Sequence, residues 1–129
     1  IFSMGAALNV GIDIGSTTIK VVVLNQAKEI VYKTYERHFS EISKALHDNL
    51  TALRDVVGGQ RFSFALTGSA GMGVAQRVGL PFVQEVVACA SAVKSLIPET
   101  DTAVELGGED AKITYFGRAS EQRMNGVCA

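Results

Sequence analysis

Two short stretches of the chain place an acid, a glycine and a lysine at the same spacing. In the first stretch, Asp13 is followed by Gly15, three hydroxyl side chains and Lys20. A turn that gathers backbone N–H groups, hydroxyls and a lysine can bind nucleotide phosphates, and the acid can hold the water shell of Mg²⁺. We therefore predict a catalytic role for Asp13. The predicted phosphate-binding residues of this first loop are Gly15, Ser16, Thr17, Thr18 and Lys20.

The second stretch repeats this order at residues 105–112. Glu105, an aliphatic residue, a glycine and Lys112 stand where the first stretch has its acid, aliphatic residue, glycine and lysine. Such a repeat is typical of internal duplication, and two facing loops would hold a triphosphate from both sides. We predict a catalytic role for Glu105 here too. The predicted phosphate-binding residues of this second loop are Gly107, Gly108, Glu109, Asp110 and Lys112. For either loop alone, an ordinary hairpin turn is the alternative.

Both loops lie between segments with strand character. Apolar residues alternate with polar ones over 8–14, and a β-branched run follows over 19–24, which predicts a hairpin. A third strand over 29–37 completes an antiparallel meander. The same three-strand pattern recurs over 102–106, 111–116 and 120–125.

The segment between the meanders predicts helices and one further strand. Apolar residues at helical spacing predict a helix over about 40–58, with Ser40 as N-cap and Glu41 in the first turn. The apolar segment 62–67 is a strand parallel to the first, because a helix connects the two. The glycines of 68–73 lack the spacing of a dinucleotide fingerprint. They form either a loop bordering the cleft or a plain strand-to-helix turn.

A second long helix is predicted over 84–97 and contains further candidate residues. Glu85, in its first turn, is either a surface acid favoured by the helix dipole or a carboxylate that positions the attacking water. We count it among the candidate catalytic residues. Cys89 is predicted to be a small buried apolar residue. His38 and His47 are predicted to be solvated, because neither has a second ligand-type residue at metal-binding spacing.

The order of elements, βββαβα and then βββ, predicts an α/β fold with one mixed sheet flanked by both long helices. We predict a flexible segment over 1–7, a first subdomain over 8–98 and the start of a truncated second subdomain over 99–129. The chain ends at Ala129 with no closing element, so we expect it to be an N-terminal fragment.

Composition narrows the class of protein. The 129 residues carry a net charge of −1, with 47% hydrophobic and 19% charged residues, and the cations are scattered. These values are typical of a globular protein and favour neither nucleic acid nor a membrane surface as partner. Because there is no signal-peptide pattern and no apolar run of membrane-spanning length, we expect a cytoplasmic protein. Two cysteines are too few for a disulfide framework.

Three segments, 11–18, 105–112 and 124–129, resemble the BadF/BadG/BcrA/BcrD ATPases. These belong to the superfamily of acetate and sugar kinases, heat-shock ATPases and actin. Residues 82–89 and 123–126 are most similar to the large multidomain members, the CoA-substrate-specific enzyme activases. The resemblance covers nearly the whole chain from Asn9 onward. It implies an actin-like ATPase (ribonuclease H-like) subdomain followed by the first meander of a second one.

The resemblance also implies a function. Family members are homodimers that activate 2-hydroxyacyl-CoA dehydratases or serve as the related benzoyl-CoA reductase components. They bind ATP between two subdomains, share one [4Fe–4S] cluster, and use ATP hydrolysis to drive one electron into the dehydratase. For this chain it implies ATP and Mg²⁺ at the two loops and Cys128 as a cluster ligand. Relatives often have Asp at Glu105, Gln at Glu109 and His at Cys89, so the role of the extra Glu109 carboxylate is open.

Two other functions remain open at this point. A sugar-type kinase of the same superfamily would use both loops but has no need of Cys128. A non-catalytic actin-like domain would share only the fold. In every case we expect the fragment alone to be inactive and to carry no cluster, because the second cluster cysteine and the adenosine pocket would follow Ala129.

Overall fold

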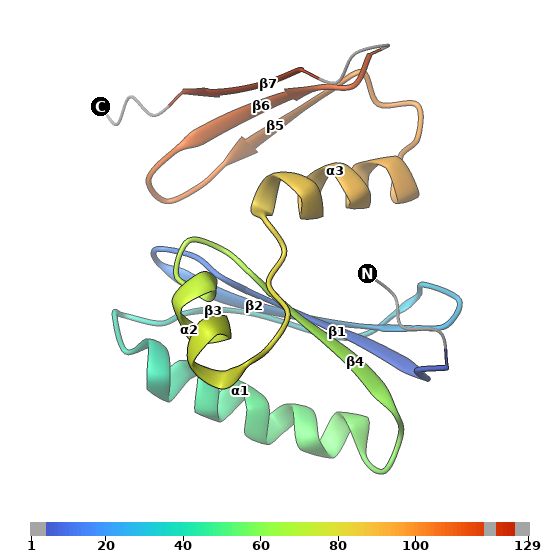
Figure 1. Cartoon of the computed structure of the whole chain (residues 1–129), viewed down its shortest axis with the longest axis vertical. Coiled ribbons are helices and arrows are strands. Elements are labelled where there is room, and N and C mark those ends of the chain that lie inside the picture. The colour runs from blue at the N-terminus through green and yellow to red at the C-terminus, as the bar shows by residue number, and fades with distance from the viewer. Residues whose placement is uncertain (1–4, 118–120, 126–129) are drawn as a thin grey trace. The chain divides into compact units, whose positions relative to one another are not determined.

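The computed structural model describes residues 5–117 and 121–125. They form two compact units, which divide between Val83 and Gln84. Figure 1 shows both units, and each is described here by itself.

The first unit is built on a four-stranded mixed sheet with the strand order β3-β2-β1-β4. Strands β1 (Leu8–Ile14), β2 (Thr18–Asn25) and β3 (Ile30–Arg37) form the predicted antiparallel meander. Strand β4 (Phe62–Thr67) pairs parallel with β1, as predicted. Strand β1 is therefore central, with β2 on one side and β4 on the other.

Two helices belong to this unit. Helix α1 (Ile42–Val57) connects β3 to β4 and covers one face of the sheet, while α2 (Gly71–Val78) follows β4 (Figure 1). Apolar side chains of the sheet alternate inward and meet Leu53 and Val57 of α1 in the core. Burying each such side chain contributes roughly 1.5–3 kcal/mol. The largest fully buried side chains are Ile12, Ile14, Ile19, Val21, Val23 and Leu66.

The start of α1 differs from the prediction. The helix begins at Ile42, and Glu41 occupies the N-cap position without a side-chain hydrogen bond, so Ser40 is not the cap. Ser40 instead has a left-handed backbone with φ of 62°, and its N–H donates to the ring of His38. A cap needs a β-region backbone whose side chain reaches forward to the first turn, which this conformation does not provide. On α1 itself, Leu50 is 39% exposed, whereas Leu53 and Val57 are buried.

The second unit contains α3 (Glu85–Leu96) and a three-stranded antiparallel sheet with the order β5-β6-β7. Its strands are β5 (Thr102–Leu106), β6 (Ala111–Tyr115) and β7 (Glu121–Asn125), close to the predicted bounds. Helix α3 was predicted as part of the first subdomain, but contacts from its side chains to β5 and β6 group it with this sheet. The subdomain boundary predicted after residue 98 stays a prediction. No helix in residues 5–117 and 121–125 is long and apolar enough to cross a membrane.

The glycine-rich segment after β4 is a strand-to-helix turn, one of the two predicted alternatives. Gly68 has φ of +97°, and a Cβ built there would lie 2.3 Å from the Ile14 carbonyl oxygen and 2.5 Å from Asp13 Oδ1. The N–H of Ala70 donates to the same Ile14 carbonyl at 2.9 Å. The turn therefore packs directly against the carboxyl end of β1, and glycine is what permits the approach.

This packing predicts opposite effects for two glycine substitutions. Gly68→Ala should lower the free energy of unfolding by about 1–3 kcal/mol or more, because the backbone is left-handed and the added methyl group meets β1. Gly73→Ala is the matched control, since this exposed glycine lies inside α2 with open space around its Cα. It should gain up to about 1 kcal/mol from helix propensity. Urea unfolding of both variants measures the difference, and equal stabilities would contradict the packing described.

Candidate functional site

The first loop, residues 13–20, is a tight hairpin between β1 and β2. The N–H of Gly15 donates to the carbonyl of Thr18 at 2.9 Å, which closes the turn around Ser16 and Thr17. Within the part of the chain that the structure describes, the N–H groups of these two residues donate no hydrogen bond. Free N–H groups beside hydroxyl side chains suit an anionic ligand.

Asp13 and Lys20 stand opposite one another in the hairpin register and form an ion pair. Lys20 Nζ lies 2.9 Å from Asp13 Oδ2, and the two side chains are 38% and 31% exposed. Partial exposure keeps such a pair weak, of the order of 1 kcal/mol or less. The lysine can therefore exchange this partner for a phosphate at little cost.

The other carboxylate oxygen of Asp13, Oδ1, is not part of this ion pair. Asp13 Oδ1 is buried and without a hydrogen-bonding partner, and so is the hydroxyl of Thr67, which stands opposite Asp13 in the β1–β4 pairing. Buried polar atoms are rarely left unsatisfied unless a water or ion completes them. Two oxygens at one sheet edge fit the waters of a hydrated Mg²⁺, which is commonly held by one or two carboxylates. Sequence reasoning missed Thr67, although it ends a strand parallel to the one that ends after Asp13.

His38 also belongs to this site, and the prediction that it is solvated is wrong. Its residue is only 4% exposed. The ring Nε2 lies 2.9 Å from the Gly15 carbonyl oxygen, and Nδ1 accepts from the N–H of Ser40 at 3.0 Å. The parallel prediction for His47, whose side chain is 80% exposed, is confirmed.

The second loop, residues 105–112, has the same backbone arrangement as the first. Glu105 pairs with Lys112 in the β5–β6 register, as Asp13 pairs with Lys20. The N–H of Gly107 donates to the Asp110 carbonyl at 2.9 Å, the same bond that closes the first loop. The predicted repeat of the hairpin is therefore confirmed in its geometry.

The charges of the second loop are arranged differently. Lys112 is only 10% exposed at its side chain and forms an ion pair with Glu85 of α3, while Asp110 Oδ2 lies 3.7 Å away. Burial lowers the pKa of Lys112, but the hydrogen bond and charge of Glu85, with Asp110 and Glu105, outweigh this and raise it. Lys112 is therefore charged and already engaged. Glu85, predicted to position water, is its principal partner, so a catalytic role for Glu85 stays a prediction.

Glu105 lies beside Cys89, and its Oε2 atom is buried with no hydrogen-bond partner. Burial raises the pKa of the Cys89 thiol to about 11, helped by a hydrogen bond and the negative charge of Glu105. The thiol is therefore protonated at neutral pH, and Cys89 is half-buried, not fully buried as predicted. At neutral pH the Cys89 thiol is therefore less reactive than an ordinary cysteine, because the thiolate is the nucleophilic form.

The other predicted metal ligand, Cys128, lies outside the described residues. Among residues 5–117 and 121–125, no three His, Cys, Asp or Glu side chains converge as a metal-ligand group.

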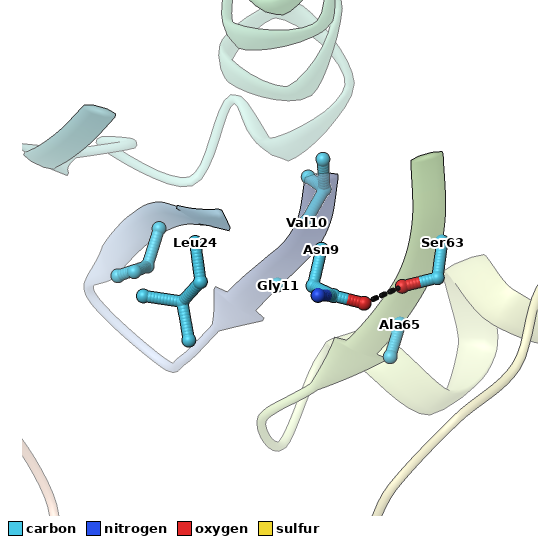
Figure 2. Close-up of a pocket in the computed structure, with 7 residues that line it drawn as sticks. Asn9, Val10, Gly11, Leu24, Ser63 and Ala65 are labelled. Carbon is cyan, nitrogen blue, oxygen red and sulfur yellow. Dashed lines mark hydrogen bonds between the residues drawn. The ribbon is translucent and has the colours of Figure 1, made fainter. Parts of the chain in front are cut away.

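A separate pocket lies on the face of the first sheet away from α1, toward the start of β1. Figure 2 shows Asn9 of β1 and Ser63 of β4 at this pocket, where the Ser63 hydroxyl donates to Asn9 Oδ1 at 2.6 Å. The remaining lining is mostly apolar and contains no charged side chain. This pocket therefore has no cation for a phosphate, in contrast to the first loop at the other end of β1.

The sequence of this chain matches a family of ATPases. The model of the BadF/BadG/BcrA/BcrD ATPase family matches residues 10–129. The (R)-2-hydroxyglutaryl-CoA dehydratase activating ATPase of Acidaminococcus fermentans is 25% identical over 131 aligned positions, covering 92% of this chain and 47% of that protein.

Solved structures with a similar fold include two dehydratase activators. The crystal structure of the Acidaminococcus fermentans (R)-2-hydroxyglutaryl-CoA dehydratase component A matches with a TM-score of 0.75 and 22% identity, covering 96% of this chain and 49% of that one. The activator of the 2-hydroxyisocaproyl-CoA dehydratase from Clostridium difficile, with bound ADPNP, matches with a TM-score of 0.69 and 28% identity, covering 95% and 47%. The predicted actin-like ATPase fold is confirmed. This chain spans about half the length of these relatives.

The raised pKa of Cys89 predicts slow alkylation. In a Cys128→Ser background, iodoacetamide should modify Cys89 at pH 8 at least about tenfold more slowly than a free thiol, because little thiolate is present. Glu105→Gln removes one cause of the shift and should speed the reaction. Asp101→Asn, an exposed acid of the same unit, is the control and should change the rate little. A pH–rate profile with an apparent pKa at or below 9 would contradict the environment described.

Proposed function

Because this chain belongs to the BadF/BadG/BcrA/BcrD ATPase family, we propose that it is part of an ATP-hydrolysing activator. The activator drives an electron from an iron–sulfur cluster into a 2-hydroxyacyl-CoA dehydratase or a benzoyl-CoA reductase-type enzyme. The observation that carries the proposal is the repeated hairpin. Both copies set an acid opposite a lysine in the register of two strands, and both lie within the residues that the family model matches.

The first loop is the proposed site for the triphosphate. The N–H groups and hydroxyls of Ser16 and Thr17 donate to phosphate oxygens, and Lys20 neutralises their charge after leaving Asp13. Preorganised donors of this kind stabilise the charge that develops during phosphoryl transfer. The bound ADPNP of the Clostridium difficile activator supports a nucleotide as the ligand.

Asp13 and Thr67 are the proposed contacts for magnesium. Their unpartnered oxygens would accept hydrogen bonds from the metal's water ligands. When bound, Mg²⁺ neutralises phosphate charge and so makes the terminal phosphorus open to attack. Gly68 contributes by allowing the turn after β4 to approach Asp13 without blocking it.

The second loop is proposed to supply further phosphate contacts, through Gly107, Gly108 and the residues that follow. Lys112 is already paired with Glu85 and Asp110. The positive charge of Lys112 therefore neutralises part of the negative charge of these carboxylates. This lowers the repulsion that a phosphate would otherwise meet at a loop rich in acids.

The redox part of the proposal rests on Cys128. A [4Fe–4S] cluster takes four thiolates, and a homodimer would supply two from each subunit across a two-fold axis. Cys128 would be one of each pair. We propose that the protein acts in the cytoplasm. A dehydratase-type enzyme is the proposed partner, and the names of its relatives support this.

The phosphate part of the proposal is tested by Asp13→Ala in the longest natural form of the protein that contains this chain. Magnesium-dependent ATP hydrolysis should fall at least about a hundredfold, because the proposed metal contact is lost. Asp55→Ala, which removes an exposed acid from α1, is the matched control and should leave turnover unchanged. Release of inorganic phosphate is the measurement, and near-normal turnover in Asp13→Ala would show that the first loop is only structural.

The redox part needs its own variant in the same protein, purified without oxygen. Cys128→Ser should remove the brown colour and the paramagnetic signal of the reduced cluster while ATP binding is kept. Cys89→Ser is the control and should keep all three, because Cys89 of α3 is not among the proposed cluster ligands. If Cys128→Ser retained the colour and the signal, Cys128 would not be a cluster ligand. If the wild type showed neither, the activator function would be wrong and a kinase or an actin-like scaffold would take its place.

A further inference from the structure

His38 is bonded to both ends of the turn in the first loop. Its ring Nε2 lies 2.9 Å from the carbonyl oxygen of Gly15, and its backbone N–H donates to the carbonyl of Thr17 at 3.1 Å. These two carbonyls bracket the Ser16 peptide groups. His38, the residue that follows β3, therefore forms hydrogen bonds with the backbone carbonyls of both Gly15 and Thr17.

The tautomer of the neutral His38 ring follows from its partners. The N–H of Ser40 can only donate, so Nδ1 must present its lone pair. The proton of a neutral ring is then on Nε2, which donates to the Gly15 carbonyl. Both nitrogens are satisfied in this tautomer, as a buried polar side chain requires.

The backbone after His38 turns back so that the N–H of Ser40 reaches the imidazole ring. Phe39 and Ser40 both have positive φ, 48° and 62°, although neither is glycine. Each such residue costs of the order of 1 kcal/mol or more, and it persists only where the surroundings impose it. This conformation brings the Ser40 N–H back to the ring and the Glu41 N–H to the His38 carbonyl at 2.8 Å. The bonds of His38 are thus maintained at the cost of backbone strain.

We propose that His38 is a positioning residue for phosphate binding. By filling the carbonyls of Gly15 and Thr17, it fixes the turn in the conformation that leaves the N–H groups of Ser16 and Thr17 for the ligand. The inference rests on the proposed nucleotide site, but the clamp itself exists without ligand. It can therefore be tested separately from that function.

The first test uses the 129-residue chain without nucleotide. Nitrogen-15 NMR of the His38 ring, at a pH where the ring is neutral, should show the tautomer protonated at Nε2. Amide order parameters of Ser16 and Thr17 should be about 0.8 or higher in the wild type and fall below about 0.6 in His38→Ala. The other tautomer, or an equally rigid loop in a folded His38→Ala, would overturn the clamp.

Two conservative variants separate the clamp from simple filling of space. Glutamine can place an amide donor near the position of Nε2, whereas asparagine is one methylene shorter and cannot. His38→Gln should therefore restore loop rigidity and His38→Asn should not. His47→Ala, a histidine exposed on α1, is the control and should leave the loop unchanged. Circular dichroism confirms that each variant is folded at the temperature used.

The second test measures Mg²⁺·ATP in the longest natural form of the protein. His38→Ala should raise the KM for ATP about tenfold and lower kcat by less, and His38→Gln should return KM to within about threefold. Unchanged KM in His38→Ala, with the fold intact, would overturn the positioning role. If the wild type bound no nucleotide, the proposed function would fail, while the order parameters would still decide whether His38 holds the loop.

Discussion

The register of β1 between its two neighbours is the constraint on which the first unit depends. Alternate residues of this strand point to opposite faces, so Ile12 and Ile14 enter the core while Asp13 stands on the other face. A slip of one residue would bury the acid and expose the isoleucines. The same register sets Asp13 between Lys20 and Thr67. Packing on one face of the sheet thus fixes the chemistry of the other.

The two loops show that one backbone can support different electrostatics. In the first, the lysine meets its cross-strand acid and both remain partly exposed, so a ligand can compete for either. In the second, α3 contributes Glu85 to Lys112 and Cys89 to Glu105, and the cross-strand pair is not formed. The hairpin therefore fixes which residues face one another, and the neighbouring helix decides which of them interact.

Local patterns predicted the strands well and the environment of single side chains poorly. Alternation over 8–14 and the β-branched run over 19–24 predicted the first hairpin to within one residue, because a strand with one buried face leaves such a pattern in the sequence. The likeness of 102–125 to this first meander predicted the second one equally well. The burial of His38 could not be predicted, because it depends on a left-handed backbone at Phe39 and Ser40. Neither residue is a glycine, so the sequence gives no sign of this conformation. Likewise Thr67 and Gly68 gain their importance from β1, which lies far away in the sequence. Such contacts follow from tertiary pairing and leave no periodic signal.

The two hairpin turns are held in place by different kinds of contact. Val104 and Leu106 occupy the positions that Ile12 and Ile14 occupy in the first hairpin, yet they are 60% and 83% exposed, whereas the isoleucines are at most 1% exposed. In the first unit, helix α1 packs on that apolar face and a buried histidine clamps the turn. Within the described part of the second unit, the polar face instead carries the contacts, through Lys112, Glu85 and Cys89. The two hairpins thus share a backbone and a register. The first turn is fixed by apolar packing and by His38, and the second by the charges of Lys112, Glu85 and Asp110.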